Sequence, residues 1–498
     1  MAYVIGIDGG TESVRAFVFD LHGRSLGSFA RTYETRFPAP GRAEQDPRDW
    51  WSALGEAVRG AVLQSGIRPD EVVGLAADTT SCSVLALDAN WEPLRPCLIW
   101  MDVRASAETE RVRATGDAAL QVNGNGTSPV SAEWMIPKAL WIATHEPQIY
   151  EKAATICEYT DYITWKLTGR KAASLNQASV RWHYNKARGG VPTSLLAKLG
   201  LESLAAKWPQ EFIAPGELLG PLTAQAAAHL GLPATVKVVQ GGCDAFIAMV
   251  GMGVSQPGQM AMITGSSHLH LGVTDRAVHG EGFWGTYQDA VYPGLNIIEG
   301  GQTSTGSVIA WLRRLTGSLD FKTLNEQAAK LPPGANGLLV LDHFQGNRTP
   351  HTDALSRGAI TGLSLFHGPE HLFRAVMEGI SFGTCAVLDA MGRGGVRPTA
   401  LTVCGGASNS PLWLQIHADT AGLPMNVPSC TDAAALGSAV MAAKGTGHYD
   451  TIQEAIDAMT SIDRVIEPNP QMHEAYREIY ARYQQLYPAM IPLRAPGG

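Results

Sequence analysis

The apolar and polar positions in the first part of the chain predict strands joined by tight turns, together with one amphipathic helix. Short runs rich in β-branched and aromatic residues end at Gly, Asp or Ser, which is typical of strands. These runs lie at 3–8, 14–20, 26–33, 72–77 and 83–88. Residues 47–65 carry apolar side chains at helical spacing, so a helix is expected to begin at Pro47, after Asp46. Strands mixed with helices in this order favour an α/β fold.

The pattern at the start of the chain returns in its second half, after a stretch rich in predicted helix. A strand is expected at 236–240, a helix at 245–253, and strands at 259–264 and 269–274. The last two strands flank a small polar turn, as the first two strands of the chain do. A chain of 498 residues is also too long for one hydrophobic core. We therefore expect two domains, 1–247 and 248–498, with a hinge near 244–256.

Composition and charge narrow the class of protein. Hydrophobic residues make up 45% and charged residues 17%, and the net charge of −8 argues against nucleic acid or an anionic membrane as partner, since both require a basic face. The seven cysteines form no C-x-x-C pair, which favours isolated buried thiols in a reducing compartment. The chain shows no signal-peptide pattern and no apolar run near the roughly 18–20 residues of a membrane helix. We expect a cytoplasmic protein without a membrane partner.

A glycine-rich turn within 8–15 has the features of a phosphate-binding loop. Two consecutive glycines let backbone N–H groups approach a phosphate closely, and Thr11 and Ser13 add hydroxyl donors. Arg15 carries the charge that would neutralise a transferred phosphoryl group. Asp8 repels phosphate, so its expected role is to hold Mg²⁺ through water. An ordinary hairpin turn with a surface arginine explains the same residues, and that alternative stays open at this point.

Asp244 stands where a predicted strand ends and a predicted helix begins, directly after Gly241, Gly242 and Cys243. In a phosphoryl-transfer enzyme, such a carboxylate orients the attacking hydroxyl and accepts its proton. We interpret Asp244 as a candidate general base. A plain helix N-cap is the alternative.

Three further segments are candidates for nucleotide contacts, namely 262–271, 299–305 and 401–423. The first is a second hydroxyl-rich turn, which would meet the β- and γ-phosphates from the other domain. In the third, glycines between a strand and a helix would let an adenine or a ribose lie on the backbone. None of them is a G-x-x-x-x-G-K-[ST] or G-x-G-x-x-G loop. A polar hairpin and a plain strand–helix connection remain the alternatives.

The segment 97–105 has the mixture of side chains that a polyhydroxylated ligand requires. Trp100 offers a flat apolar wall, while Asp102 and Arg104 offer a hydrogen-bond acceptor and a fork of donors. Asp78 and Thr79 would supply further polar partners. The alternative for Asp102 and Arg104 is an ion pair at the surface.

Taken together and in this order, these motifs resemble the FGGY family of carbohydrate kinases. The resemblance is carried by 5–20, 97–105, 161–169, 241–245 and 405–424. Each segment alone is weak evidence for the family, but five such segments in the same order along most of the chain are specific evidence for it. The resemblance implies two actin-like (ribonuclease H-like) domains around a deep cleft, with sugar mainly on the first domain and ATP mainly on the second.

The resemblance also implies roles for individual residues. Asp244 matches the catalytic aspartate of the family, while Asp8, Thr11 and Arg15 match its first phosphate motif. The other nucleotide contacts that it implies are Gly265, Ser266 and Ser267 for phosphate, Gly405, Gly406 and Asn409 for adenosine, and Gly301 and Thr303. The expected cofactors are ATP and Mg²⁺. Members of the family are often dimers, although no feature of this sequence indicates an interface.

The expected reaction is transfer of the γ-phosphoryl group of ATP to a terminal hydroxyl of a ketopentose such as ribulose. The residues at 78–83 look closer to the ribulokinase-like branch than to the glycerol kinases or xylulokinases. Xylulose, erythritol and glycerol remain alternative substrates. An alternative from another class is an actin-like ATPase, a chaperone or filament subunit that shares the phosphate turns but lacks a site for a hydroxyl acceptor.

Overall fold

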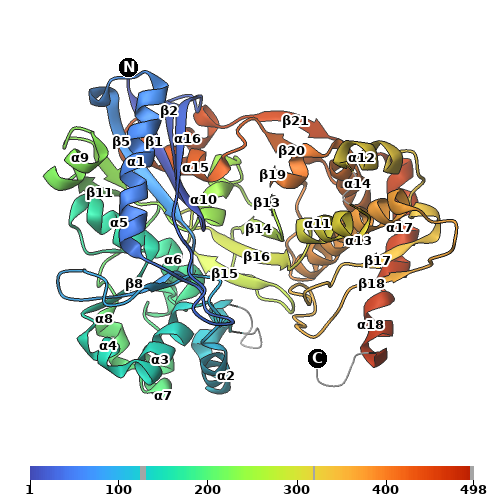
Figure 1. Ribbon diagram of the computed structural model, residues 1–498, viewed down its shortest axis with the longest axis horizontal. Coiled ribbons are helices and arrows are strands. Elements are labelled where there is room, and N and C mark those ends of the chain that lie inside the picture. Colours follow the sequence, from blue (N-terminus) through green and yellow to red (C-terminus); the bar gives the residue numbers. More distant parts are fainter. Residues whose placement is uncertain (124–129, 318–319, 494–498) are drawn as a thin grey trace.

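The computed structural model describes residues 1–123, 130–317 and 320–493, which form two lobes (Figure 1). The sheet of the first lobe has the spatial order β11 (Leu218–Pro221), β12 (Lys237–Val239), β5 (Val72–Thr79), β1 (Tyr3–Gly9), β2 (Ser13–Asp20) and β3 (Ser25–Thr32). Strand β1 pairs antiparallel with β2 and parallel with β5. Strand β2 also pairs antiparallel with β3, so the strands expected at 3–8, 14–20 and 26–33 are present as a three-stranded meander.

The second lobe contains a larger sheet with a related arrangement at its centre. Its order is β15 (Trp284–Gln288), β16 (Asn296–Gln302), β14 (His268–Thr274), β13 (Gln259–Thr264), β19 (Ala400–Gly405), β20 (Met425–Pro428) and β21 (Ile462–Ile466). Strand β13 pairs antiparallel with β14 and parallel with β19, as β1 does with β2 and β5. The similarity between the two halves that the sequence pattern indicates is thus present in the strand pairing.

The first lobe also contains two smaller sheets and a group of helices in its lower part, and the second lobe contains a further two-stranded sheet (Figure 1). One sheet has the order β4 (Glu44–Gln45), β7 (Cys97–Leu98), β6 (Val84–Leu87) and β8 (Thr155–Glu158), and two-stranded sheets pair β9 (Ala173–Ser174) with β10 (Phe212–Ile213) and β17 (Leu339–Leu341) with β18 (Ala359–Thr361). The helices of the first half are α1 (Pro47–Ser65), α2 (Ser106–Ala114), α3 (Met135–His145), α4 (Pro147–Lys152), α5 (Tyr159–Thr168), α6 (Leu175–Arg181), α7 (Thr193–Leu199), α8 (Glu202–Lys207), α9 (Ala224–Leu230) and α10 (Asp244–Gly251).

The first helix shows how local sequence sets element bounds. Asp46 accepts a hydrogen bond from the backbone N–H of Arg48, Pro47 stands at the first helical position, and Gly66 ends the helix with φ 70°. The helices of the second half are α11 (Gly306–Leu315), α12 (Phe321–Ala328), α13 (Pro369–Arg393), α14 (Pro411–Ala421), α15 (Ala433–Gly445), α16 (Ile452–Met459), α17 (Pro470–Tyr483) and α18 (Leu486–Met490). Across the described ranges, no helix combines the length and the apolar character needed to cross a membrane.

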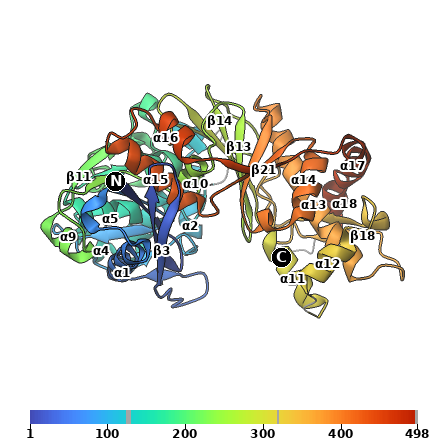
Figure 2. The ribbon, with the colours of Figure 1, turned by 90° about the horizontal axis from the view of Figure 1, so that it is seen from above.

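Helix α15 comes from the second half of the chain but packs on the sheet of the first lobe. A Cβ at Gly6 of β1 would lie 1.8 Å from the carbonyl oxygen of Ala435, so strand and helix are in direct backbone contact. Figure 2 shows α15 and α16 beside α10 on the side of the first lobe. Helix α15 lies after the expected boundary at 247/248 in the sequence, but it packs with the elements that precede this boundary.

Candidate functional site between the lobes

The turn between β1 and β2 lies at the space between the two lobes. The N–H of Gly10 donates to the carbonyl of Ser13 at 3.0 Å, which closes the hairpin. The indole Nε1 of Trp100 donates to Oγ1 of Thr11 at 2.8 Å, so the phosphate-type turn and the predicted sugar wall are in contact. Thr11 lines the cavity described below.

The turn between β13 and β14, residues 265–267, is exposed and lies against the start of α11. The N–H of Gly265 donates to the carbonyl of Ser267 at 2.9 Å, and the N–H of Thr305 donates to the carbonyl of Ser266 at 2.8 Å. This packing fixes the turn on a helix N-terminus, which is favourable for anions.

The glycine pair after β19 lies beside that turn, because Gly405 pairs with Thr264, the last residue of β13. Gly405 has φ 90°, and a Cβ there would lie 1.9 Å from the carbonyl oxygen of Thr264. A Cβ at Gly406 would meet nothing within 4 Å, and Asn409 is exposed. The turn predicted to bind phosphate and the turn predicted to bind adenosine thus follow two neighbouring strands, β13 and β19, at the same end of the second sheet.

Asp244 is the first residue of α10, and Cys243 is the N-cap. Its Oδ1 accepts a hydrogen bond from the N–H of Ala245 at 2.6 Å. Burial and the nearby charge of Asp8 raise the pKa of Asp244 to about 6. The carboxylate is therefore charged at neutral pH but is a stronger base than an exposed aspartate, as a proton acceptor requires.

Two buried carboxyl groups, Asp8 and Asp78, and the partly exposed Asp432 lie near the phosphate turns. Asp8 makes an ion pair with Arg15, which also pairs with Asp432 at 3.2 Å. Asp78 is fully buried, and its Oδ2 accepts a hydrogen bond from Ser438 at 2.7 Å. Burial raises the pKa of Asp8, against the opposing effect of Arg15, and burial together with the charge of Asp8 raises the pKa of Asp78. This corner of the site therefore combines three carboxyl groups with one guanidinium.

A cavity of about 270 Å³ lies where the two lobes meet. It brings together Thr11, Trp100, Asp244 and Ser267, four residues that the sequence singled out. The first lobe adds the turn at 80–82 after β5 together with Glu133, Trp134 and Arg181, and the second lobe adds Leu269, Trp284, Glu299 and Arg348. A proton acceptor, an aromatic wall and one residue of each phosphate-type turn therefore face one space.

Four residues predicted to bind the sugar are not among those that line this cavity. Asp102 is fully buried, and its carboxylate is already occupied by the N–H of Ala43 at 2.7 Å and by the guanidinium of Arg104 at 2.7–2.9 Å. Oγ1 of Thr79 is bonded to Thr160 at 2.6 Å, and Asp78 faces α15. The structure thus gives Asp102 and Arg104 the role of an internal ion pair, and we no longer assign these four side chains to the substrate.

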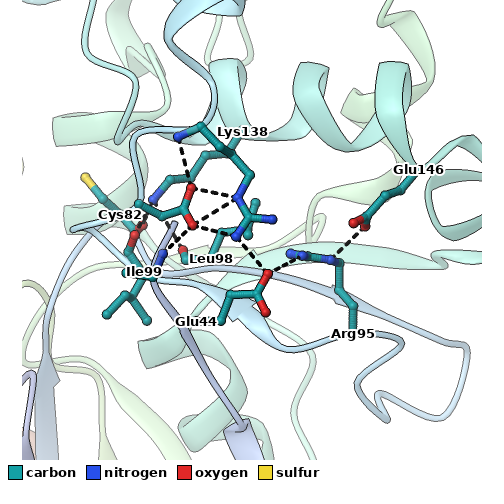
Figure 3. Close-up of polar contacts among 10 residues, drawn as sticks. Glu44, Cys82, Arg95, Leu98, Ile99, Lys138 and Glu146 are labelled. Carbon is teal, nitrogen blue, oxygen red and sulfur yellow. Dashed lines mark hydrogen bonds and ion pairs between the residues drawn. The ribbon is translucent and has the colours of Figure 1, made fainter. Parts of the chain in front are cut away.

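Arg104 and Asp102 belong to a larger buried network. Nη2 of Arg104 also lies 2.7 Å from Glu44, which pairs with Arg95 at 2.9 Å, and Arg95 in turn pairs with Glu146 at 2.8 Å (Figure 3). These charges tie β4 and β7 to the end of α3. The surface ion pair considered as an alternative is therefore a core network instead.

Two predicted nucleotide contacts have polar groups engaged within the protein. The N–H of Gly301 donates to Oγ1 of Thr349 at 3.2 Å, and Oγ1 of Thr303 donates to the carbonyl of Gly346 at 2.7 Å. Their contact with a nucleotide stays a prediction. Ser13 stands at the start of β2 and serves the hairpin through its carbonyl.

The sequence reasoning missed the ion pair that joins the lobes across the cavity. Nη1 and Nη2 of Arg181 on α6 lie 2.9 and 3.1 Å from the carboxylate of Glu299 on β16, and both side chains are buried. Tyr287 donates to the same carboxylate at 3.1 Å. Glu299 lies in a segment whose pattern indicates only nucleotide contacts, and Arg181 ends a short helix without any motif, so no local signal marks the pair.

Two aromatic side chains close the cavity from opposite lobes. The rings of Trp134 and Trp284 meet edge to face, with centroids 5.9 Å apart, and the guanidinium of Arg348 lies 4.8 Å from the ring centroid of Trp284.

His268 and His270 are buried in the second lobe near His417 and Trp413. Among the described residues, no group of three His, Cys, Asp or Glu side chains is arranged to hold a metal ion.

Comparison with known proteins identifies the fold and the family. Residues 3–251 match the N-terminal domain and residues 260–446 the C-terminal domain of the FGGY family of carbohydrate kinases. The chain belongs to this family. Its fold is the two-domain actin-like (ribonuclease H-like) arrangement of FGGY sugar kinases. The expectation of a carbohydrate kinase is confirmed.

Proteins similar to this FGGY kinase do not all share one named substrate. The ribulokinase of Geobacillus thermodenitrificans is 32% identical, with 97% of this chain and 94% of the relative covered. The human FGGY carbohydrate kinase domain-containing protein is 30% identical over 97% of this chain and 96% of its own length. The crystal structure of xylulose kinase from Rhodospirillum rubrum superposes with a TM-score of 0.88 at 28% identity and covers 99% of each chain.

Proposed function

We propose that this FGGY kinase transfers the γ-phosphoryl group of ATP to the terminal hydroxyl of a ketopentose such as ribulose. One observation carries the proposal. Asp244 shares a cavity with Thr11 and Ser267, one residue from each of the two phosphate-type turns. A carboxylate that faces both a ligand-sized space and the end of a phosphate chain is the arrangement that transfer to a hydroxyl requires.

Asp244 acts on the attacking hydroxyl. With its pKa at about 6, the side chain is mostly ionised at neutral pH and accepts the proton as the oxygen attacks phosphorus. The transition state of phosphoryl transfer is loose, so orientation of the hydroxyl contributes more than its full deprotonation. The place of Asp244 at the start of a helix, held by the N–H of Ala245, fixes that orientation.

The two phosphate-type turns supply fixed dipoles for the transferring group. The turn at 265–267 adds backbone N–H groups and two serine hydroxyls, and Thr11 adds a hydroxyl that accepts from Trp100. Arg15 provides positive charge behind the first turn, since its guanidinium is half exposed beside Asp8. Such donors stabilise developing charge without reorganisation during the reaction. We place the adenosine against 405–409.

Magnesium fits the acidic corner of the site, and we assign Asp8 to hold the ion through water. One carboxylate oxygen of Asp8 pairs with Arg15, and the other lies beside Gly10, where a Cβ would be 3.7 Å from it. Mg²⁺ in kinases keeps several waters and is bound by few carboxylates together with substrate phosphates. When bound, the ion would partly neutralise the negative charge of the phosphates.

The acceptor half of the cavity suits a small linear polyol. Trp100 and Trp134 provide apolar surface for the carbon chain, while Glu133 and the turn at 80–82 provide partners for hydroxyl groups. The volume of about 270 Å³ is slightly below the roughly 300–1,000 Å³ of typical small-molecule sites, which suits a small acceptor. The ribulokinase relatives at about 32% identity support ribulose over the alternatives xylulose, erythritol and glycerol.

The test is a panel assay of ADP release with ATP and magnesium. The acceptors are both enantiomers of ribulose and of xylulose, together with erythritol and glycerol, and each rate is compared with the rate without acceptor. We expect the largest kcat/KM with one ribulose enantiomer. A higher value with glycerol or erythritol would overturn the ketopentose assignment. ATP consumption that no acceptor stimulates would instead favour the actin-like ATPase alternative.

A further inference from the structure

Lys138 on α3 carries an ammonium group that is fully buried and bonded only to backbone carbonyls. Its Nζ donates to the carbonyl of Cys82 at 2.7 Å, of Ile99 at 2.7 Å and of Leu98 at 3.3 Å (Figure 3). An ammonium has three donors, so all of them are used. Within the described ranges, no carboxylate lies at ion-pair distance from this nitrogen.

The three carbonyls belong to two segments that form walls of the cavity. Cys82 is part of the turn at 80–82, and Ile99 directly precedes Trp100, whose indole bonds to Thr11. The helix of Lys138 itself begins next to Glu133 and Trp134, which form a third wall. One buried side chain therefore connects three parts of the acceptor half of the site.

The turn at Cys82 needs such support, because its backbone is strained. Cys82 has φ 61°, a conformation that is uncommon for a residue with a Cβ and persists where the surroundings hold it. Its N–H donates to Glu158 Oε2 at 2.7 Å, and the same carboxylate accepts from Trp182 at 2.7 Å. Glu158 thus holds the N–H of Cys82, while Lys138 holds its carbonyl.

We propose that Lys138 is a positioning residue that holds the walls of the acceptor half of the cavity in place and thereby sets the affinity for the sugar. The inference rests on the proposed function, since it takes this cavity to be the sugar site. It goes beyond that function because Lys138 touches neither the cavity nor the phosphate turns. Displacement of a binding wall by about 1 Å is enough to lower activity on the order of 100-fold.

A general loss of stability is the competing explanation for any defect at Lys138, and Arg95 offers a matched control. Arg95 is also a buried cation in the first lobe, but its partners Glu44 and Glu146 do not line the cavity. Removal of its charge disturbs the same region without releasing a wall of the acceptor site. The two variants thus separate a local effect on sugar binding from a general effect on the fold.

The experiment compares wild type with Lys138→Met and Arg95→Met, because methionine keeps an apolar stem of similar length without the donors. For each protein, kcat and KM for ribulose are measured together with the Kd for ADP and the Tm. For Lys138→Met we expect kcat/KM for ribulose to fall by about 10- to 100-fold, mostly through KM, with the Kd for ADP within about threefold. For Arg95→Met we expect a lower Tm with an unchanged KM for ribulose.

An unchanged KM in Lys138→Met, or an equal loss of ribulose and ADP binding, overturns the positioning role. If Lys138→Met does not fold, as judged by ADP binding, Lys138→Gln, which keeps two N–H donors on a shorter stem, takes its place. Failure of that variant to fold would likewise overturn the inference. Wild type that accepts no ketopentose would instead contradict the proposed function itself.

Discussion

Asp244 has to be charged to accept a proton, while its surroundings favour the protonated form. Burial and the charge of Asp8 raise its pKa to about 6, above the 3.8 of an exposed aspartate. We expect Asp244→Asn to lower kcat by about 100- to 10,000-fold, because the proton acceptor is lost. The Kd for ADP should stay within a few-fold. A variant that retains turnover on every ketopentose would exclude Asp244 as the base.

The same pKa gives two dependences on pH with opposite signs. The base works when ionised, so kcat/KM for the sugar, which reports ionisations of the free enzyme, should fall as pH drops through about 6. A carboxyl with a raised folded-state pKa adds to stability below its unfolded pKa, and this contribution is lost as pH rises through about 6. Asp244→Asn should therefore have a higher Tm than wild type at pH 7, and the difference should vanish near pH 4. Thermal unfolding at both pH values checks this, and a constant difference would contradict it.

Gly405 and Gly406 are adjacent glycines with different reasons for lacking a side chain. A Cβ at Gly405 would lie 1.9 Å from the carbonyl oxygen of Thr264 with φ at 90°, whereas a Cβ at Gly406 would meet nothing within 4 Å. We expect Gly405→Ala to lower the Tm clearly and to move the adenosine turn, while Gly406→Ala leaves the Tm unchanged. If nucleotide lies on this turn, Gly406→Ala should still raise KM for ATP. Equal Tm values for both variants would contradict the backbone argument.

At the scale of elements, the crossing of α10 and α15 determines where Asp244 lies. Each helix presents a glycine to the other. A Cβ at Gly251 would lie 2.0 Å from the carbonyl oxygen of Ala433, and a Cβ at Gly437 would lie 2.0 Å from that of Ile247. Contact this close leaves no room to slide, and α10 begins at Asp244. The position of this carboxylate, the proposed proton acceptor, therefore depends on a helix nearly two hundred residues further along the chain, α15 (Ala433–Gly445).

We expect Gly437→Ala to push the two helices apart, to destabilise the protein by about 1–3 kcal/mol, and to lower kcat. The control is Gly392→Ala in α13, where the nearest heavy atom would be 3.8 Å from the new Cβ. There, alanine should be neutral or stabilising by up to about 1 kcal/mol, since it is the better helix former. Urea unfolding and steady-state kinetics of both variants provide the test. Equal behaviour of the two would show that the crossing is not tight.

At the scale of the whole molecule, one buried ion pair joins the lobes across the cavity. Arg181 and Glu299 contact each other through both guanidinium Nη atoms, and removal of one partner leaves the other charge buried and unpaired. We expect Arg181→Met to destabilise the protein by about 3–5 kcal/mol. The double variant Arg181→Met, Glu299→Met should recover a large part of this loss. Urea unfolding midpoints without ligand test the prediction, and a double variant less stable than the single one would contradict it.

Local pattern sufficed for much of the fold and for part of the site. The hairpin turns at 9–12 and 265–267, the strand that leads to Asp244 and the helix that follows are written in neighbouring residues, because turns and caps depend on contacts a few positions apart. Such local signals single out Thr11, Trp100, Asp244 and Ser267, which line one cavity in the folded protein.

Only the tertiary structure decided which polar side chains remain free for a ligand. Asp102 and Arg104 look like sugar ligands in the sequence, but folding brings Ala43 and Glu44 to them and occupies their hydrogen-bonding groups. Arg181 meets Glu299 across 118 positions, and Asp78 meets Ser438 across 360. No local pattern encodes such pairs. The sequence by itself thus determined the elements and singled out the phosphate-type turns and the proposed base, while long-range packing decided which residues line the cavity between the lobes.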